Sequence, residues 1–222
     1  MEQASATVSF ADLTIAQFVE HLSSAEPVPG GGAAAAVAAA LGASLVSMVA
    51  GLSTGKARYE AYQVTLAKCE ALGHELAAEF VRLADQDAEA YAGYTAALKM
   101  PRETEDEQQA RKMAIAAAAR AAAEAPLDCV RACLRLAIAA EALAGRSNVN
   151  AASDVLVAAL LGEAAARSAA ENVLINLPST GDEQYSEKMR WQVDSVLHEI
   201  AAVAARTREI VLSGQSQDPE PE

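Results

Sequence analysis

The residues most suited to chemistry lie in the segment 85–91, which reads Asp-Gln-Asp-Ala-Glu-Ala-Tyr. Aspartate is a poor residue for a helix interior, yet Asp85 and Asp87 interrupt a long stretch with helical apolar spacing. They lie two positions apart and point to different sides, whereas Asp87 and Tyr91 are four apart and share a face. A carboxylate in such a place can carry a proton between reacting groups. The same pattern fits a solvated helix face, and the segment alone does not separate the two.

A run of three glycines, Gly30, Gly31 and Gly32, follows Pro-Val-Pro and precedes an alanine-rich stretch. Consecutive glycines let a backbone approach a ligand closely, and a helix N-terminus offers unpaired N–H groups to an anion. No Gly-Lys-Ser/Thr follows, so the run is not a nucleotide-binding P-loop. The alternative is a tight turn between two closely packed helices.

Asparagines form the third group. Asn148 and Asn150 stand in a loop that ends near Asp154, and Asn172 and Asn176 share a helix face inside an apolar segment. Buried amides need hydrogen-bond partners, which here are either loop backbone or a polar ligand ring. Helix capping, and side-chain hydrogen bonds that hold the loop in place, explain these asparagines equally well.

The elements that carry these residues are predicted to be helical. The chain has 222 residues with 52% hydrophobic and 4% aromatic side chains, and it is rich in alanine, the best helix former. We expect an all-α bundle of six or seven helices in a single domain, 1–212, followed by a disordered acidic tail, 213–222. The expected helices cover 14–23, 32–52, 56–99, 103–124, 126–144, 154–177 and 183–212. Pro126 is expected to start or kink a helix.

Charge and composition exclude several classes. The net charge of −13 argues against nucleic acid as a partner. The uncharged stretch 27–55 is long enough to span a bilayer, but its many small residues favour a buried central helix, so we expect no membrane partner. The three cysteines lack a C-x-x-C pattern and the three histidines lack zinc spacing, which predicts neither a disulfide framework nor a metal site. The N-terminus does not resemble a signal peptide, and the expected location is cytoplasmic.

Taken together, these stretches resemble the cyclodeaminase/cyclohydrolase family of folate enzymes. This is the C-terminal domain of formiminotransferase-cyclodeaminase, also found as stand-alone methenyltetrahydrofolate cyclohydrolases. The markers are P-V-P-G-G-G (27–32), S-M-V (47–49), T-G-K-A-R-Y (54–59), D-A-E-A-Y (87–91), M-P-R-E-T-E-D-E (100–107), A-P-L (125–127), N-V-N-A-A-S-D (148–154) and N-V-L-I-N-L (172–177). The resemblance implies an all-helical homodimer that binds a tetrahydrofolate derivative as substrate near the glycine run and the dimer interface, with no cofactor. Ala33 and Ser147 depart from the family pattern, which often has Ser and Gly there.

The resemblance also implies roles for individual residues. Asp87 would carry the proton, with Asp85 as second choice and Tyr91 to orient Asp87. Lys56 would pair with the glutamate tail of folate or keep a carboxylate ionised. The amides of Gly30–Gly32 would receive that tail or a pterin oxygen. The pterin edge would be bound by Asn148, Asn150, Asp154, Asn172 and Asn176.

Recruitment of an anionic folate by so acidic a chain needs a local basic patch. Its candidates are Lys56, Arg58, Lys99, Arg102 and Arg146. The alternative to an enzyme is a non-catalytic helical dimer that acts as a folate-binding or structural module.

Overall fold

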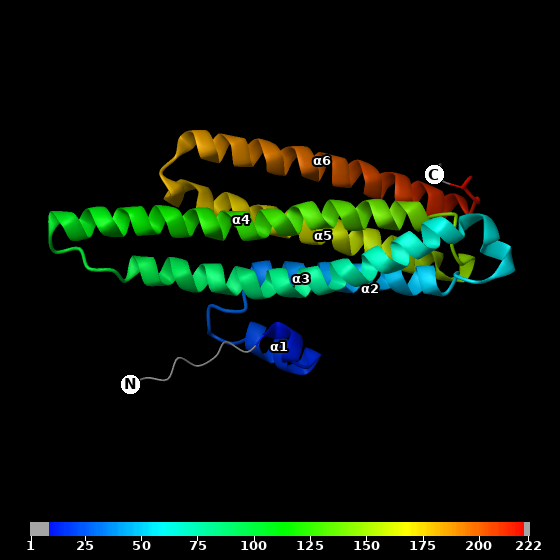
Figure 1. Ribbon diagram of the computed structural model, residues 1–222, viewed down its shortest axis with the longest axis horizontal. Coiled ribbons are helices and arrows are strands. Elements are labelled where there is room, and N and C mark those ends of the chain that lie inside the picture. The colour runs from blue at the N-terminus through cyan, green and yellow to red at the C-terminus, as the bar shows by residue number, and fades with distance from the viewer. Residues whose placement is uncertain (1–8, 220–222) are drawn as a thin grey trace.

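The computed structural model describes residues 9–219, and in that range the chain forms six α-helices, four short 3₁₀ helices and no strand (Figure 1). The helices are α1 (Ile15–Leu22), α2 (Gly31–Gly51), α3 (Gln63–Leu98), α4 (Glu105–Leu143), α5 (Ala152–Asn176) and α6 (Glu183–Ser213). The predicted all-α bundle with several long helices is therefore confirmed.

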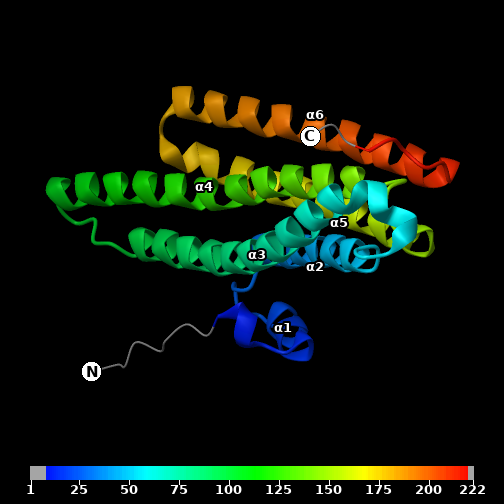
Figure 2. The same ribbon diagram turned by 45° about the vertical axis from the view of Figure 1, so that its right-hand side comes forward.

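The bundle is built around α2, which packs mainly against α3 and α5. Helix α4 packs against α3, α5 and α6, and α6 runs along the side of the bundle opposite α1 (Figure 1). Helix α1 stands off the bundle beneath α3 in both views (Figures 1 and 2). The connection between α3 and α4 and the turn between α5 and α6 lie toward the same end of the molecule.

Small residues let α2 approach its neighbours. A Cβ added at Gly42 would lie 3.1 Å from the Ala158 carbonyl of α5, and one at Gly73 would lie 2.8 Å from the Ala43 carbonyl of α2. Two helical stretches, Gly31–Gly51 and Val149–Thr180, are long and apolar enough to cross a membrane by length and composition. In the 18-residue apolar segment of each, 61% and 39% of the residues are buried in the bundle. The first is the central core helix of the bundle, as the sequence predicts.

Helix α4 runs without a break through Pro126, where the sequence predicts a boundary or kink. Proline has no N–H for the carbonyl four residues earlier, and here that carbonyl, of Ala122, accepts instead a hydrogen bond of 3.0 Å from Asn176 Nδ2. The helix continues because its lost partner is replaced from α5. At the start of the expected helix 56–99, residues Ala57–Tyr62 form a 3₁₀ helix, so that α3 begins only at Gln63.

The C-terminal segment differs from the disordered tail expected for 213–222. Helix α6 includes Ser213, and the chain then folds back toward the α4–α5 connection. The backbone N–H of Gln217 donates to the Gly145 carbonyl at 3.1 Å, and the Tyr62 hydroxyl donates to the Gln217 carbonyl at 2.9 Å. Arg146 Nε donates to the Asp218 carbonyl at 2.6 Å. Residues 220–222 lie outside the described range.

Candidate active site

A cavity of about 450 Å³ opens where the N-terminus of α2 meets the last third of α3 and the end of α5. Its wall includes Gly30–Gly32, Asp87, Tyr91, Asn172 and Asn176, which are seven of the twelve predicted site residues. These wall residues come from three different helices, α2, α3 and α5, and the packing of these helices brings them to one place. The 3₁₀ turn Leu177–Thr180 closes the end of the cavity with Ser179.

Asp87 lies directly against the start of α2. Its carboxylate accepts a hydrogen bond from the backbone N–H of Ala33, and the carboxylate occupies the space where a side chain at Gly32 would stand. A Cβ at Gly32 would lie 2.5 Å from Asp87 Cγ. The absent side chain of Gly32 thus admits the carboxylate to the helix N-terminus, where backbone N–H groups favour an anion. This amide end of α2 is therefore engaged by the protein's own Asp87.

Two opposing influences set the proton affinity of Asp87. Burial raises the pKa of the carboxyl above its ordinary value of 3.8, and the hydrogen bond from Ala33 lowers it. Burial is the larger influence, so the pKa is raised. A raised pKa brings a carboxyl closer to the range in which it both accepts and returns protons.

Two tyrosines of α3 continue the wall on the same side as Asp87. Tyr91 follows one turn later and is 44% exposed, so its ring borders the opening of the cavity. Tyr94 follows at seven residues, and its hydroxyl lies 2.9 Å from Ser179 Oγ. The contact joins α3 to the turn after α5 and fixes the far wall of the cavity.

The two asparagines of α5 are held by their own amide groups. Asn172 Nδ2 donates to the Ser168 carbonyl at 2.9 Å, and Asn176 Nδ2 donates to the carbonyls of Asn172 and Ala122 at 2.8 and 3.0 Å. Because the donors point at backbone, the side-chain oxygens remain the groups able to accept from a ligand. Asn176 also satisfies the carbonyl that Pro126 leaves without a partner.

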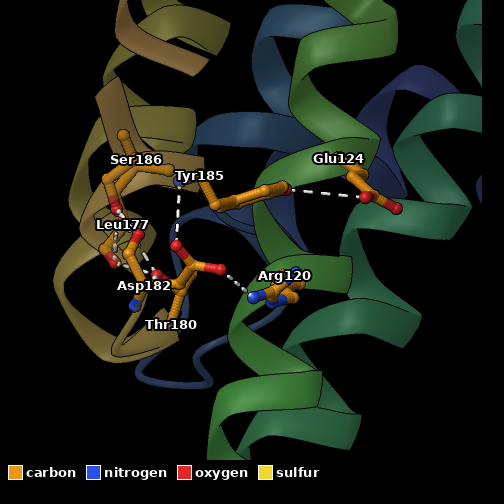
Figure 3. A network of polar contacts seen from close by, with 7 residues as sticks. All are labelled: Arg120, Glu124, Leu177, Thr180, Asp182, Tyr185 and Ser186. Carbon is orange, nitrogen blue, oxygen red and sulfur yellow. Dashed lines mark hydrogen bonds and ion pairs between the residues drawn. The ribbon is translucent and has the colours of Figure 1, made fainter. Parts of the chain in front are cut away.

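A network of polar contacts anchors the turn that carries Ser179 (Figure 3). Arg120 of α4 binds Asp182 at 2.6 Å, and its guanidinium lies 4.7 Å from the centroid of the Tyr185 ring. Asp182 caps α6 by accepting from the Tyr185 N–H at 3.0 Å. Inside the turn, Thr180 Oγ1 donates to the Leu177 carbonyl at 2.7 Å. The end wall of the cavity is therefore tied to both α4 and α6.

The other five predicted residues lie away from this cavity. Asp85 accepts from Ser9 Oγ at 2.6 Å and from the Phe10 N–H at 2.8 Å, so its carboxylate holds the N-terminal segment. The remaining four, Lys56, Asn148, Asn150 and Asp154, follow the far end of α2 or precede and begin α5.

With ~1.5 Å of rise per residue, the length of α2 separates that far end from the glycine run by about 30 Å. Asn148 there accepts from the Asn150 N–H at 3.1 Å and lines a separate cavity of about 140 Å³. The single site expected from the sequence is thus divided between the two ends of the bundle.

Sequence reasoning missed Tyr94, Ala122, Ile175 and Ser179 as wall residues. Tyr94 is detectable in retrospect, because a spacing of seven from Asp87 keeps it on the same helix face. Ala122 carries an indirect signal, since it stands four residues before a proline. The position of Ser179 depends on the 3₁₀ turn Leu177–Thr180 and has no signal in the local sequence. Within 9–219, no cluster of three or more His, Cys, Asp or Glu side chains is arranged to hold a metal ion.

Comparison with known proteins places the whole bundle in one family. A sequence model of the formiminotransferase-cyclodeaminase family matches residues 14–195. The chain is 36% identical to a methenyltetrahydrofolate cyclohydrolase of Methylorubrum extorquens over 90% of its own length and 96% of that protein. It is 34% identical to the formimidoyltransferase-cyclodeaminase of Rattus norvegicus over 89% of its length, and there spans only 36% of the longer relative.

A solved structure agrees with the sequence relatives. The crystal structure of formiminotetrahydrofolate cyclodeaminase from Thermotoga maritima superposes with a TM-score of 0.83 at 29% identity, covering 91% of this chain and 98% of that one. These relatives are enzymes, and the family model matches residues 14–195, a range that includes α1 to α5 and the residues that line the cavity at Asp87. The chain belongs to the formiminotransferase-cyclodeaminase family, within its cyclodeaminase/cyclohydrolase branch.

Proposed function

We propose that this protein is a tetrahydrofolate one-carbon enzyme that opens the bridge of 5,10-methenyltetrahydrofolate with water to give 10-formyltetrahydrofolate. The observation that carries the proposal is the half-buried Asp87 carboxylate in the cavity at the start of α2, with a raised pKa and two tyrosines beside it. The methenyl bridge is a cation, so a carboxylate in a partly desolvated cavity attracts the reactive part of this substrate.

The first step is the addition of water to the bridge carbon. A lone pair of the water oxygen forms the C–O bond, and Asp87 takes one proton from that water as general base. The electron pair of the C=N bond moves to nitrogen, which cancels the positive charge of the bridge. The product of the step is a neutral tetrahedral carbon held between N5 and N10.

The second step breaks the bond between that carbon and N5. The hydroxyl proton leaves as the C=O bond forms, and Asp87 returns its proton to N5 as the C–N5 bond breaks. One proton is released overall, which balances the loss of the substrate's positive charge. Tyr91 and the side-chain oxygens of Asn172 and Asn176 serve to hold the folate ring against Asp87.

Ring closure of 5-formimidoyltetrahydrofolate, with release of ammonia, is the second candidate. It is favoured by the match to the cyclodeaminase structure of Thermotoga maritima. It passes through the same kind of tetrahedral carbon, which here forms by attack of N10 on the formimidoyl carbon and breaks down with ammonia as the leaving group. Asp87 would take the proton from N10 and supply it to the departing nitrogen.

Two assays on the purified protein decide between the candidates. The first follows the loss of 5,10-methenyltetrahydrofolate, and the second follows ammonia released from the formimidoyl compound. We expect the first to be faster. Ammonia release without methenyl loss would transfer the proposal to the cyclodeaminase. Folate binding without either reaction would leave the binding module predicted as the alternative.

The working form of the enzyme is proposed to be a homodimer, supported by unpaired apolar surface. Leu41 of α2 is 55% exposed, and Leu160 of the adjacent α5 is 49% exposed. Ile15 and Val19 of α1, which stands off the bundle, are 81% and 57% exposed. Burial of these side chains against a second copy would remove apolar surface from water, and two-fold pairing is the commonest form of association. Light scattering should give twice the mass of one chain, and a monomer at micromolar concentration would contradict the proposal.

A further inference from the structure

Asp85 lies two residues before Asp87 on α3, and the proposed reaction does not use it. Both oxygens of its half-buried carboxylate accept hydrogen bonds from the N-terminal segment. Oδ2 accepts from Ser9 Oγ at 2.6 Å, and Oδ1 accepts from the Phe10 N–H at 2.8 Å. Aspartate is unfavourable inside a helix, so these two bonds are the structural gain that its position brings.

The chain that Asp85 holds is a short, ordered turn. Ser9 caps the 3₁₀ turn Phe10–Asp12, because its Oγ accepts from the Ala11 N–H at 3.2 Å. The same hydroxyl therefore joins the turn to α3. The Phe10 side chain is half-buried and packs against the hydrophobic core of the bundle. The carboxylate and this ring together fix the turn on α3.

Helix α1 is held within its own chain through this turn. None of the residues Ile15–Leu22 is buried, and the helix stands off the bundle (Figures 1 and 2). The Phe18 ring meets the Phe10 ring edge to face, with 5.6 Å between the centroids. The direction in which α1 leaves the bundle is thus set where Asp85 anchors the turn.

The chain that follows α1 forms part of the wall of the candidate active site. A hydrogen-bonded turn at Ser24 reverses its direction, and Pro27 and Val28 then line the cavity. Segment 9–30 is therefore attached to the bundle at two places. One is Asp85, and the other is the cavity wall, where the segment enters α2.

We propose that Asp85 is a positioning residue, which holds the N-terminal segment so that Pro27 and Val28 close the cavity over the folate. The inference rests on the proposed function, because it assumes that folate occupies the cavity at Asp87. Residues two apart on a helix point to different sides. Asp85 therefore acts through the hydrogen bonds that it accepts, and Asp87 through the proton that it moves.

Release of the segment affects binding more than chemistry. The Asp87 carboxylate is held by the Ala33 N–H and by the space at Gly32, and both belong to α2. Loss of the contact at Asp85 leaves these features in place. It frees Pro27 and Val28 to move, which opens the cavity and removes part of the surface that contacts the ligand. The Michaelis constant should therefore rise while kcat stays near its native value.

The test measures kcat and KM for 5,10-methenyltetrahydrofolate, and the dissociation constant of 5-formyltetrahydrofolate by calorimetry. In the Asp85→Ala variant, KM and the dissociation constant should both rise about tenfold, as expected if the segment stays in place in about one molecule in ten. The value of kcat should stay within about threefold of native, since the proton carrier is unchanged. Circular dichroism and thermal unfolding confirm that each variant is folded at the assay temperature.

The conservative variant Asp85→Asn should restore binding. Its amide oxygen can accept from the Phe10 N–H, and its NH₂ group can donate to Ser9 Oγ. We expect both constants within about threefold of native, whereas removal of a carboxylate that carries protons would cost about 10²-fold or more in kcat. The matched control is Glu89→Ala, which removes an exposed carboxylate two residues beyond Asp87 and should keep native constants.

Ser9→Ala tests the same contact from the other side. It removes one of the two bonds to Asp85, so KM should rise about threefold, with no further rise when it is combined with Asp85→Ala. Should Asp85→Ala fail to fold, Ser9→Ala carries the test, and an unchanged KM in this variant would overturn the inference.

Two results with a folded Asp85→Ala variant would also overturn it. One is native values of KM and of the dissociation constant. The other is a fall in kcat that Asp85→Asn does not rescue, which would make Asp85 a proton carrier. If the native protein binds 5-formyltetrahydrofolate but lacks both activities, the proposed reaction is refuted and the dissociation constants still test Asp85. Failure of the native protein to bind folate refutes both.

Discussion

Substitution of Gly32 by alanine tests the geometry of the site most sharply. The added Cβ would stand 2.5 Å from Asp87 Cγ, whereas carbon atoms pack at about 3.5–4.0 Å. The carboxyl must therefore move by about 1 Å, and displacement of a catalytic group on this scale costs about 10²-fold in rate. The helix itself gains from the change, since alanine is the better helix former.

The expected result is a loss of about 10²-fold in kcat for 5,10-methenyltetrahydrofolate in a protein that remains folded. The matched control is Gly31→Ala, where the nearest atom, Asn172 Nδ2, would lie 4.0 Å from the new Cβ. It should lose far less activity, because that distance is an ordinary contact. The assay is the absorbance decay of the substrate, with thermal unfolding recorded for both variants. A Gly32→Ala enzyme within a few-fold of native kcat would refute the close approach of Asp87 to α2.

Three further predictions concern stability. Asn176→Ala should lower the free energy of unfolding by about 1–3 kcal/mol, because it removes the hydrogen-bond donor to the Ala122 carbonyl, which Pro126 leaves without a helical partner. The loss should be smaller in a Pro126→Ala background, and a double-mutant cycle measured by urea unfolding would show this. Gly73→Ala should destabilise the folded protein by about 1–3 kcal/mol, because the new Cβ would collide with the backbone of α2. Gly93→Ala should stabilise it by about 0.4–1 kcal/mol, because nothing lies within 4 Å of the new Cβ. Thermal unfolding measures both changes. The Asp87→Asn variant should be more stable than the native protein at neutral pH and equally stable below the ordinary pKa of 3.8. The reason is that the carboxyl ionises at lower pH in the unfolded chain than in the folded one, so native stability falls as pH rises toward the raised folded pKa. A difference in unfolding free energy between the two proteins that is the same at all pH values would contradict burial as the cause.

Much of the fold follows from sequence pattern. The alanine-rich stretch after Gly30, the apolar spacing of residues 63–98 and the Thr104–Glu107 capping box each specify a helix locally, and the structure has α2, α3 and α4 there. The boundary expected at Pro126 is absent for a reason outside that segment. The carbonyl lost to proline is satisfied by Asn176 from another helix, and no local rule reveals such a partner.

The candidate site is only partly predictable for the same reason. Asp87 and Tyr91 are on one helix face by spacing, and Asn172 and Asn176 likewise, so each pair is visible in the sequence. Their meeting depends on how α3, α4 and α5 pack around α2. Asp85 illustrates the limit, since two carboxylates of equal appearance take different partners once the N-terminal segment folds against one of them.

The account depends most on Asp87 as the group that moves the proton. The direct measurement is kcat for 5,10-methenyltetrahydrofolate in the Asp87→Asn variant, with the native circular dichroism spectrum and folate binding as controls. General acid–base catalysis by this carboxyl predicts a fall of about 10²–10⁴-fold in kcat while folate binding persists. A variant that is folded, binds folate and turns over at the native rate would contradict the central claim.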